Sequence, residues 1–381
     1  MYDAIVVGGG IVGASTAYHL ARGGAETLLL DRHDAGRATD AGAGILSPAT
    51  SSRTDSTAWF EFALDAANYY PTLVDRLTEE QDGETGYARC GLLSVAVDED
   101  ERAAFEAEFE RIADRRETYG HPAPGSVSEL DSDEARARFP PLAETDRCLA
   151  YDDAARVDGR TFTAALRRAG RNRGLAVAEE DVTRIDRDDG SVSGVRTASG
   201  DRYDADAVVV AGGAWSRAFE ESLGVSIPVE PQRGQILHLD LRDADTEAWP
   251  IVGGFRGHYM VPWPDGRVAV GATRETGSGF EPRTTAGGVR EVLDEALRVA
   301  PGLADAEIRD IRVGLRPRSA DRLPVLGPIP TVDGVHLATG HGATGLQLGP
   351  YSGKIVADSV LGEQGDEPTE LERFGVERFS S

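Results

Sequence analysis

Residues 1–31 constrain the fold more than any other part of the sequence. The apolar residues 4–7 lead directly into the motif GGGIVG at 8–13, and residues 14–20 have the composition of a helix. A second apolar run, residues 27–30, ends in Asp31. This order predicts a strand, a glycine turn, a helix and a parallel strand, as in domains that bind dinucleotides.

Each marked position in this unit has a physical role. Gly8 permits the tight turn, Gly10 lets the backbone approach a pyrophosphate, and Gly13 lets the helix pack closely on the strand. Asp31 can accept hydrogen bonds from ribose hydroxyls. Because strand, spacing and terminal acid agree, we disfavour the alternative of a turn that binds nothing. The pattern does not choose between NAD and FAD.

The charge of the chain limits its partners. The 381 residues carry a net charge of −25, which argues against nucleic acid or anionic lipid as a ligand. No apolar run approaches the roughly 20 residues of a membrane-spanning helix. Two cysteines are too few for a disulfide framework, and the first residues do not resemble a signal peptide, so we expect a cytoplasmic protein.

The acidic surface also predicts the source. Lys354 is the only lysine, so nearly all basic residues are arginine. A strongly acidic, lysine-poor surface suits a salty cytoplasm, because molar salt screens the self-repulsion. We therefore hypothesise a halophilic source and expect thermal stability to rise with molar KCl; a melting temperature that does not rise would contradict it.

The remaining pattern predicts alternating elements. Residues 56–80 read as a helix bent at Pro71, 87–97 as one strand and 101–119 as a charged helix. Asp158 is expected to cap a helix whose arginines form a solvated basic face. Further helices are predicted near 288–300 and from the glycine-rich 340–345 to about 361, and strands are predicted at these ranges: 192–203 (a hairpin), 207–211, 234–241, 257–261, 267–272, 323–327 and 334–338.

Five stretches together resemble a known family, the FAD-dependent D-amino acid oxidase superfamily, and within it the branch of glycine oxidase and D-amino acid dehydrogenase. They follow the family's order and span nearly the whole chain. The stretches are VGGGIVG at 7–13, TDAGAGIL at 39–46, VVVAGGAWS at 208–216, YMVP at 259–262 leading to GAT at 271–273, and GLRP at 314–317 followed by GHGATG at 340–345.

The resemblance implies the fold class: α/β (α+β), with a Rossmann-like FAD-binding domain and a substrate domain built on a mixed or antiparallel β-sheet. We expect a discontinuous FAD-binding domain of residues 1–80, 145–225 and 320–381. Residues 81–144 and 226–319 would then form the substrate-binding domain.

The resemblance also implies which residues contact FAD. Small residues at 41–44 and 212–213 would let the backbone lie against the flavin, and the glycine-rich helix start could direct N–H groups at its pyrimidine edge. No cysteine lies near Arg316 and no histidine lies in 39–46, so we expect FAD to be held non-covalently. The expected FAD contacts are Gly8, Gly10, Ile11, Val12, Gly13, Asp31, Arg32, Thr39, Ala41, Gly42, Ala43, Gly44, Ile45, Leu46, Val182, Gly212, Trp215, Gly342, Ala343, Thr344, Gly345 and Leu346.

Two residues are expected at the substrate end. By resemblance, Arg316 of the LRP motif pairs with a substrate carboxylate and Tyr259 of the YMVP motif donates a second bond. A planar guanidinium binds a carboxylate through two parallel hydrogen bonds, which would anchor the α-carbon. The alternatives are a surface salt bridge for Arg316 and a core aromatic position for Tyr259.

Two positions depart from the glycine oxidase pattern. Arg274 replaces an apolar residue, and Ala343 replaces a basic one. We hypothesise that Arg274 projects into the pocket, where it contacts an acidic substrate side chain or partly replaces the missing base. The alternative is an ion pair at the rim with Glu275 or another carboxylate.

The resemblance implies oxidation of the Cα–N bond of a small amino acid, glycine or a D-amino acid, by hydride transfer to flavin N5. Alternatives are sarcosine- or proline-type secondary amines, 2-hydroxy acids, or an electron-transfer flavoprotein subunit of a complex. The acceptor, oxygen or a quinone or electron-transfer protein, stays open. No metal site is expected, because no histidine or cysteine cluster has ligand spacing. A homo-oligomer is compatible with the sequence.

Overall fold

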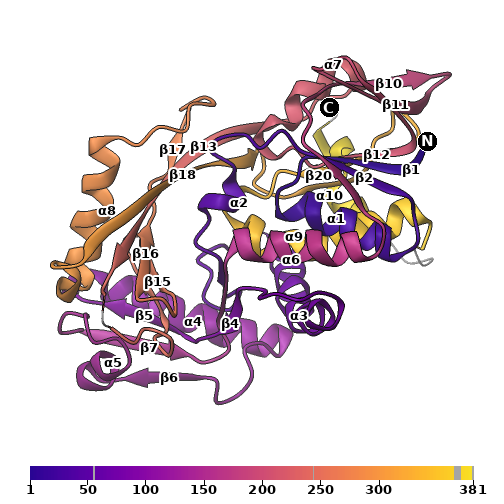
Figure 1. Cartoon of the computed structure of the whole chain (residues 1–381). Helices are drawn as coiled ribbons and strands as arrows, with labels where there is room; N and C mark the ends of the chain where they lie inside the picture. The colour runs from indigo at the N-terminus through magenta and orange to yellow at the C-terminus, as the bar shows by residue number, and fades with distance from the viewer. Residues whose placement is uncertain (55, 243, 364–369, 380–381) are drawn as a thin grey trace.

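The computed structural model describes residues 1–54, 56–242, 244–363 and 370–379. Its largest features are two β-sheets joined by the long strands β13 and β18, with helices around them (Figure 1). Among the described residues we find no helix that is long and apolar enough to cross a bilayer.

The predicted βαβ unit forms the centre of an eight-stranded sheet. β1 pairs in parallel with β2 on one side and β12 on the other, and α1 (Ile11–Arg22) connects β1 to β2. Parallel order continues to β9 and β20, whereas β10, β11 and β19 pair antiparallel. In spatial order the strands are β10 (Val182–Asp188), β11 (Ser191–Thr197), β12 (Arg202–Val210), β1 (Tyr2–Val7), β2 (Thr27–Leu30) and β9 (Ala176–Ala178), with β20 (Val335–Thr339) beside β12 and β19 (Val325–Pro328) beside β20.

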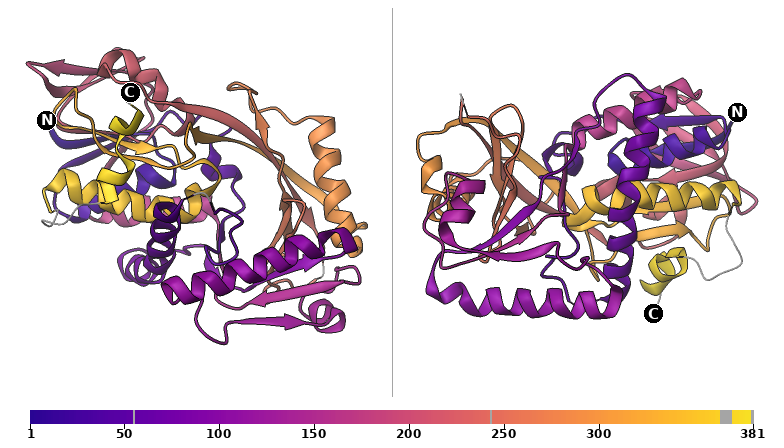
Figure 2. Two further views of the ribbon diagram at one scale, coloured as in Figure 1. Left: turned by 180° about the vertical axis from the view of Figure 1, so that it is seen from behind. Right: turned by 90° about the horizontal axis from the view of Figure 1, so that it is seen from below.

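Alternation along β1 divides the core of this sheet. Ala4 and Val6 pack against α1, α3 (Thr57–Glu80) and α9 (Gly345–Leu361), whereas Ile5 and Val7 face the β10–β11 hairpin and α7 (Glu220–Leu223). Figure 2 shows α3 crossing α9 beneath the sheet. Both faces of the parallel strands are therefore covered, as parallel sheets require.

The second sheet is mainly antiparallel and has nine strands. The one parallel pair is β14 with β5. In spatial order the strands are β17 (Glu275–Thr276), β13 (Val229–Asp240), β16 (Arg267–Gly271), β15 (Tyr259–Pro262), β14 (Ile251–Gly254), β5 (Leu92–Ala96), β7 (Arg147–Tyr151) and β6 (Val127–Leu130), and β18 (Glu307–Ser319) pairs with the remaining edge of β13.

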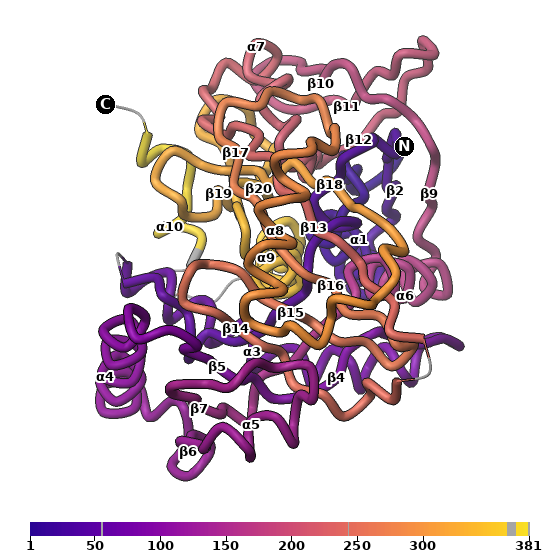
Figure 3. The backbone as a smooth tube through the Cα atoms, turned by 90° about the vertical axis from the view of Figure 1, so that its left-hand side faces the viewer, coloured from indigo at the N-terminus to yellow at the C-terminus, as the bar shows by residue number. Residues whose placement is uncertain are grey.

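Helix α8 (Ala286–Val299) covers one face of this sheet (Figure 3). Leu237 of β13 points toward the α8 side, and its neighbour Ile236 points to the opposite side, which faces the first sheet. α4 (Arg102–Tyr119) packs its Phe105 and Ile112 beside β5 and β7. The other face, which carries Ile236 and Val261, is thus turned toward the first sheet and is buried against it.

The smaller elements complete the chain. A three-stranded sheet lies between the two larger ones, in the order β3 (Ile45–Leu46), β8 (Ala155–Val157) and β4 (Tyr87–Arg89). The remaining helices are α2 (Ala38–Ala41), α5 (Ser132–Arg138), α6 (Gly159–Asn172) and α10 (Glu370–Phe374), and short 3-10 turns include η2 (Gly213–Phe219) and η4 (Gly342–Thr344).

The predicted fold class is confirmed, with local corrections. Residues 87–97 form two strands in different sheets, because the chain turns at Gly91 with φ +72°. The strands β3, β6, β7, β8, β9, β10, β14, β17 and β18 were not predicted. The helix predicted over 56–80 is present as α3, which includes Pro71. The division into two domains stays a prediction; β7 pairs within the nine-stranded sheet although its residues fall in the range expected for the FAD-binding domain.

Candidate functional site

A large cavity lies where the parallel strands end and the second sheet begins. It opens at the carboxyl ends of β1, β2, β12 and β20, the position where open parallel sheets bind ligands. Its empty space, with the open mouth included, is about 1650 Å³. Its lining includes the glycine turn of the first sheet and residues of β13, β15 and β18, so one cavity extends between the two sheets.

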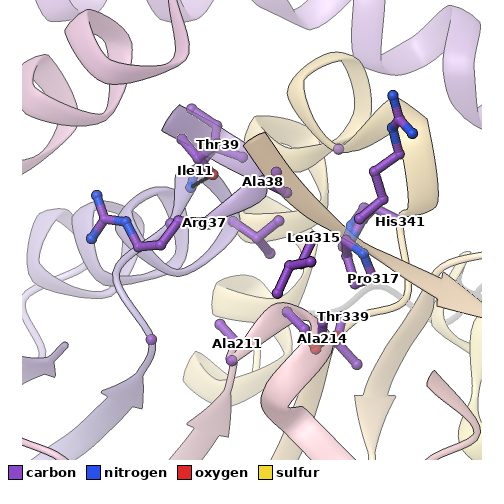
Figure 4. Close-up of a pocket in the computed structure, with 18 of the residues that line it drawn as sticks. Ile11, Arg37, Ala38, Thr39, Ala211, Ala214, Leu315, Pro317, Thr339 and His341 are labelled. Carbon is purple, nitrogen blue, oxygen red and sulfur yellow. Dashed lines mark hydrogen bonds between the residues drawn. The ribbon is translucent and has the colours of Figure 1, made fainter. Parts of the chain in front are cut away.

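The glycine turn forms one wall of this cavity. Gly13 lies so close to β1 that a Cβ atom on it would stand 1.9 Å from the Gly8 carbonyl oxygen. The Ile11 amide donates to Thr39 Oγ1 at 3.0 Å, and Figure 4 shows these two side chains together at the cavity wall. The turn and α2 are thereby held against the start of α1, where backbone N–H groups favour phosphate.

Asp31 lies at the far end of the cavity and is held by two arginines. Its Oδ2 accepts from Arg37 Nη1 at 2.6 Å and from Arg167 Nη2 at 2.7 Å, and Arg167 also donates to the Gly9 carbonyl. Burial raises the pKa of Asp31, but the two arginines outweigh burial and hold the pKa below its usual value. Asp31 therefore stays ionised, with Oδ1 free of partners among the described residues.

The arginines beside Asp31 were missed by the sequence prediction. The arginines of α6 were expected to form a solvated face, which is wrong for Arg167, because its side chain is only 13% exposed and points at the glycine turn. Its carboxylate partner lies 136 residues earlier, so no local signal could have revealed the pair. Asp158 caps α6 as predicted, by accepting from the amides of Arg160 and Thr161.

Most of the residues predicted to contact FAD line the cavity. The exceptions are Gly13, which packs α1 on β1, Leu46, which faces a second, smaller cavity, and Thr344, which bonds to the His341 carbonyl. The sequence did not single out several further lining residues, some of them labelled in Figure 4: Arg37, Ala38, Ala214, Gly234, Ile236, Thr339, His341 and Gln347.

Arg316 projects from β18 into the end of the cavity opposite Asp31. Its Nη1 donates to the Thr273 carbonyl at 2.8 Å, and its guanidinium lies directly over Gly234 of the neighbouring strand. Burial lowers the pKa of Arg316, opposed by Tyr259 and reinforced by Arg274. Within the described part of the chain no carboxylate pairs with it, so the surface salt bridge considered above is wrong.

Tyr259 lies on β15 and lines the same end of the cavity. Burial raises the pKa of its phenol, and the opposing effects of Arg316 and Arg274 are smaller. The hydroxyl therefore stays protonated and can donate a hydrogen bond to an anion held by Arg316.

Arg274 follows β16 at the mouth of the cavity and is exposed. Its Nη1 donates to the Gly257 carbonyl at 2.9 Å. The alternative of an ion pair with Glu275 is wrong, because that carboxylate binds Arg233 through Nε at 3.0 Å and Nη2 at 2.5 Å. Ala343 lines the cavity without supplying a charge.

Substituting Gly234→Ala should displace the Arg316 guanidinium. The new Cβ would lie 2.4–2.5 Å from three guanidinium atoms, and the end of that flexible side chain can move away. We expect kcat/KM to fall about tenfold, with little change in melting temperature, since one charged hydrogen bond is lost or misplaced. Steady-state kinetics and calorimetry on the same sample measure both quantities.

The matched control is Gly253→Ala in the same sheet, where the nearest atom to a new Cβ is 3.9 Å away. This variant should keep the kinetic constants of the wild type. Equal losses in both variants would show that Gly234 does not act through Arg316.

His341 lines the cavity but is not protonated at neutral pH. Burial lowers its pKa to about 4, and Nε2 lies 2.9 Å from Ser352 Oγ. A histidine in the unfolded chain titrates near 6.5. As the pH falls from about 6.5 to 4, the unfolded state therefore binds a proton that the folded state does not bind, and the free energy of unfolding decreases. When the pH is lowered from 7 to 5, the free energy of unfolding should therefore fall by roughly 2 kcal/mol less in His341→Gln than in the wild type.

Urea unfolding of the two proteins at both pH values checks this result. A pH dependence that His341→Gln leaves unaltered would contradict the assignment.

The residues present fit a flavin dinucleotide. The glycine turn, the small residues 41–44 and the turn after β12 bring backbone rather than side chains to the cavity wall, and an ionised Asp31 lies at the end suited to a ribose. The opposite end offers Arg316 and Tyr259 to a small anion. A dinucleotide can thus lie along the first sheet with a substrate under the second.

Comparisons with known proteins agree with this site. The family model DAO, described as FAD dependent oxidoreductase, matches residues 3–359. An uncharacterized oxidoreductase, YurR of Bacillus subtilis, is 40% identical over 96% of each chain, and a glycine oxidase of Pseudomonas aeruginosa is 32% identical over 94% of this chain and 95% of its own. The crystal structure of iminodiacetate oxidase from Chelativorans sp. BNC1 has a TM-score of 0.92, 39% identity and 98% coverage of both chains.

The matches cover both the glycine turn and the end of the cavity that holds Arg316 and Tyr259. They agree with the five motifs found in the sequence and with the two-sheet fold. The chain therefore belongs to the DAO family of FAD-dependent oxidoreductases, and FAD is its cofactor.

Proposed function

We infer that this protein oxidises the Cα–N bond of a small amino acid, with glycine and D-amino acids as first candidates. The product is an imine that water hydrolyses to an oxo acid and ammonia. The observation that carries this proposal is the Arg316 guanidinium, which has no carboxylate partner in the part of the chain that the structure describes and shares one cavity with the dinucleotide-binding turn. FAD, when bound, supplies the acceptor for the hydride that leaves Cα.

The residues of the chain act mainly by orientation. Arg316 binds the substrate carboxylate through its planar guanidinium, and the protonated Tyr259 hydroxyl donates a further bond. Two anchors on adjoining strands restrict rotation of the bound amino acid, so that Cα is presented in one direction. Such pre-organisation lowers the entropy cost of bringing the reacting groups together, which a reaction in solution has to meet in full.

The start of α9 contributes a second, electrostatic effect. Gly342, Ala343 and Gly345 line the cavity at the amino end of this helix. Partial positive charge at a helix amino terminus favours negative charge nearby. We expect this to favour the reduced cofactor, which carries more negative charge.

Secondary amines are the second candidate. The relative that is 39% identical is an iminodiacetate oxidase, and iminodiacetate is a glycine whose nitrogen carries a second carboxymethyl group. Arg316 and Tyr259 suit the carboxylate of such a substrate equally well. Sarcosine and proline fall in the same class.

The test is reduction of the flavin without oxygen. Holoenzyme in high KCl is mixed anaerobically with glycine, D- and L-amino acids, sarcosine, proline, iminodiacetate or 2-hydroxy acids, and loss of flavin absorbance is followed. Bleaching by amino acids is expected, and readmitted air shows whether oxygen is the acceptor. Bleaching by 2-hydroxy acids alone, or by nothing in the panel, would overturn the proposal, and the latter would favour an electron-transfer subunit.

A further inference from the structure

Two guanidinium groups end in the same small part of the cavity without a carboxylate partner. Arg316 Nη1 donates a hydrogen bond to the Thr273 carbonyl, and Arg274 Nη1 donates one to the Gly257 carbonyl. In the described ranges neither forms an ion pair. Neither charge is therefore paired, although acidic groups outnumber basic ones in this chain of net charge −25.

The nearest carboxylate in sequence is fully engaged elsewhere. Besides Arg233, Glu275 accepts from Gln235 Nε2 at 2.6 Å and from Thr273 Oγ1 at 2.8 Å. Gln235 and Thr273 are buried, so this network keeps the carboxylate turned away from Arg274. The remaining N–H groups of Arg274 have no protein acceptor among the described residues.

We propose that this end of the cavity selects substrates with two carboxylates, one bound by Arg316 beside Tyr259 and the other by Arg274 at the mouth. The inference rests on the proposed function and adds the substrate class. The two arginines come from different elements: Arg316 lies within the paired strand β18, and Arg274 lies on the segment after β16. They can therefore bind two groups of one small molecule from two sides.

Electrostatics favours the same assignment. Part of the depression of the Arg316 pKa comes from the positive charge of Arg274, so the two groups repel each other in the empty site. A monocarboxylate neutralises one of them, whereas a dicarboxylate neutralises both. Charge-assisted bonds to guanidinium are stronger than neutral ones, and a substrate lacking the second carboxylate leaves Arg274 without this bond.

Binding of unreactive acids tests the proposal without turnover. Holoenzyme is titrated with malonate and succinate, and with the monocarboxylates acetate and propionate, by calorimetry and by the change in the flavin spectrum. The dicarboxylates should bind about tenfold more tightly than the monocarboxylates, as expected for one added charge-assisted contact at an exposed rim.

Three variants decide the role of Arg274. In Arg274→Met, the ratio of the dissociation constant of a monocarboxylate to that of a dicarboxylate should fall close to one. Arg274→Lys should keep part of the preference for dicarboxylates. Arg290→Met removes the same charge from an exposed pair with Asp294 on α8, and should keep the wild-type ratio. The ratio of kcat/KM for dicarboxylic substrates to kcat/KM for monocarboxylic substrates should follow the same order. It should be highest in the wild type and Arg290→Met, intermediate in Arg274→Lys and lowest in Arg274→Met.

The proposal is wrong if wild-type holoenzyme binds dicarboxylates no more tightly than monocarboxylates, or if the preference survives Arg274→Met. These outcomes differ from failure of the proposed function. A protein that keeps the Arg274-dependent preference for malonate and succinate but oxidises no amine would overturn the reaction and support the anion site.

Discussion

Arg316→Met should lower kcat/KM about a thousandfold for every amino acid that the enzyme oxidises. The carboxylate would lose a planar, charged partner in a partly buried site, a loss worth about 4 kcal/mol. Because the same contact orients Cα, KM should rise and kcat should fall together. Stopped-flow flavin reduction and steady-state assays measure both.

Stability separates this effect from a structural one. Arg316 carries a charge that burial disfavours and that Tyr259 and Glu275 offset only in part, so methionine of similar length should leave the melting temperature unchanged or higher. The flavin should remain bound, as its absorbance will show. The control is Arg309→Met. Arg309 lies on the same strand as Arg316 and forms a surface ion pair with Asp265, so its loss should leave full activity. Loss of flavin from Arg316→Met would contradict the assignment to substrate.

Gly13→Ala should cost both stability and cofactor. The added methyl would stand 1.9 Å from the Gly8 carbonyl oxygen, which belongs to the backbone and cannot rotate away, so α1 must shift from β1. We expect a loss of about 3 kcal/mol in unfolding free energy of the apoprotein. FAD affinity should fall about a hundredfold, since the amino end of α1 moves relative to the pyrophosphate position.

Gly287→Ala provides a control with the same chemical change. It also lies in a helix, α8, but no atom is within 4 Å of its new Cβ. Alanine should stabilise that helix by about 0.5–1 kcal/mol. Denaturant titration and fluorescence quenching by FAD distinguish the two variants. If Gly13→Ala bound FAD like the wild type, the close packing of α1 on β1 would not be what positions the cofactor.

Local chemistry explains what the sequence predicted correctly. The βαβ unit is encoded by neighbouring residues, so strand, turn and helix could be located before any contact was known. Arg316 and Tyr259 were found only through motifs shared with a family. Their convergence in one cavity depends on strands that are distant in sequence, and burial or exposure could not be decided without that packing.

The missed features share one physical cause. β18 contains Gly314 and Pro317, which are disfavoured within strands and weaken the strand signal, and it is formed by pairing with β13 about 80 residues away. Arg167 lies in a helix that is basic in composition, and only the fold brings it to Asp31. Long-range pairing, rather than local preference, determined both outcomes.

The continuous pairing of β18 with β13 also limits how this enzyme can change over evolution. β18 spans thirteen residues in antiparallel register and carries Arg316 near its end. Because side chains alternate between faces, inserting or deleting one residue in β18 before Arg316 would turn that arginine away from the cavity. Lineages that diverge in substrate should therefore retain the length of this strand and change by substitution. Insertions are better tolerated after β17, in the largely exposed segment before α8.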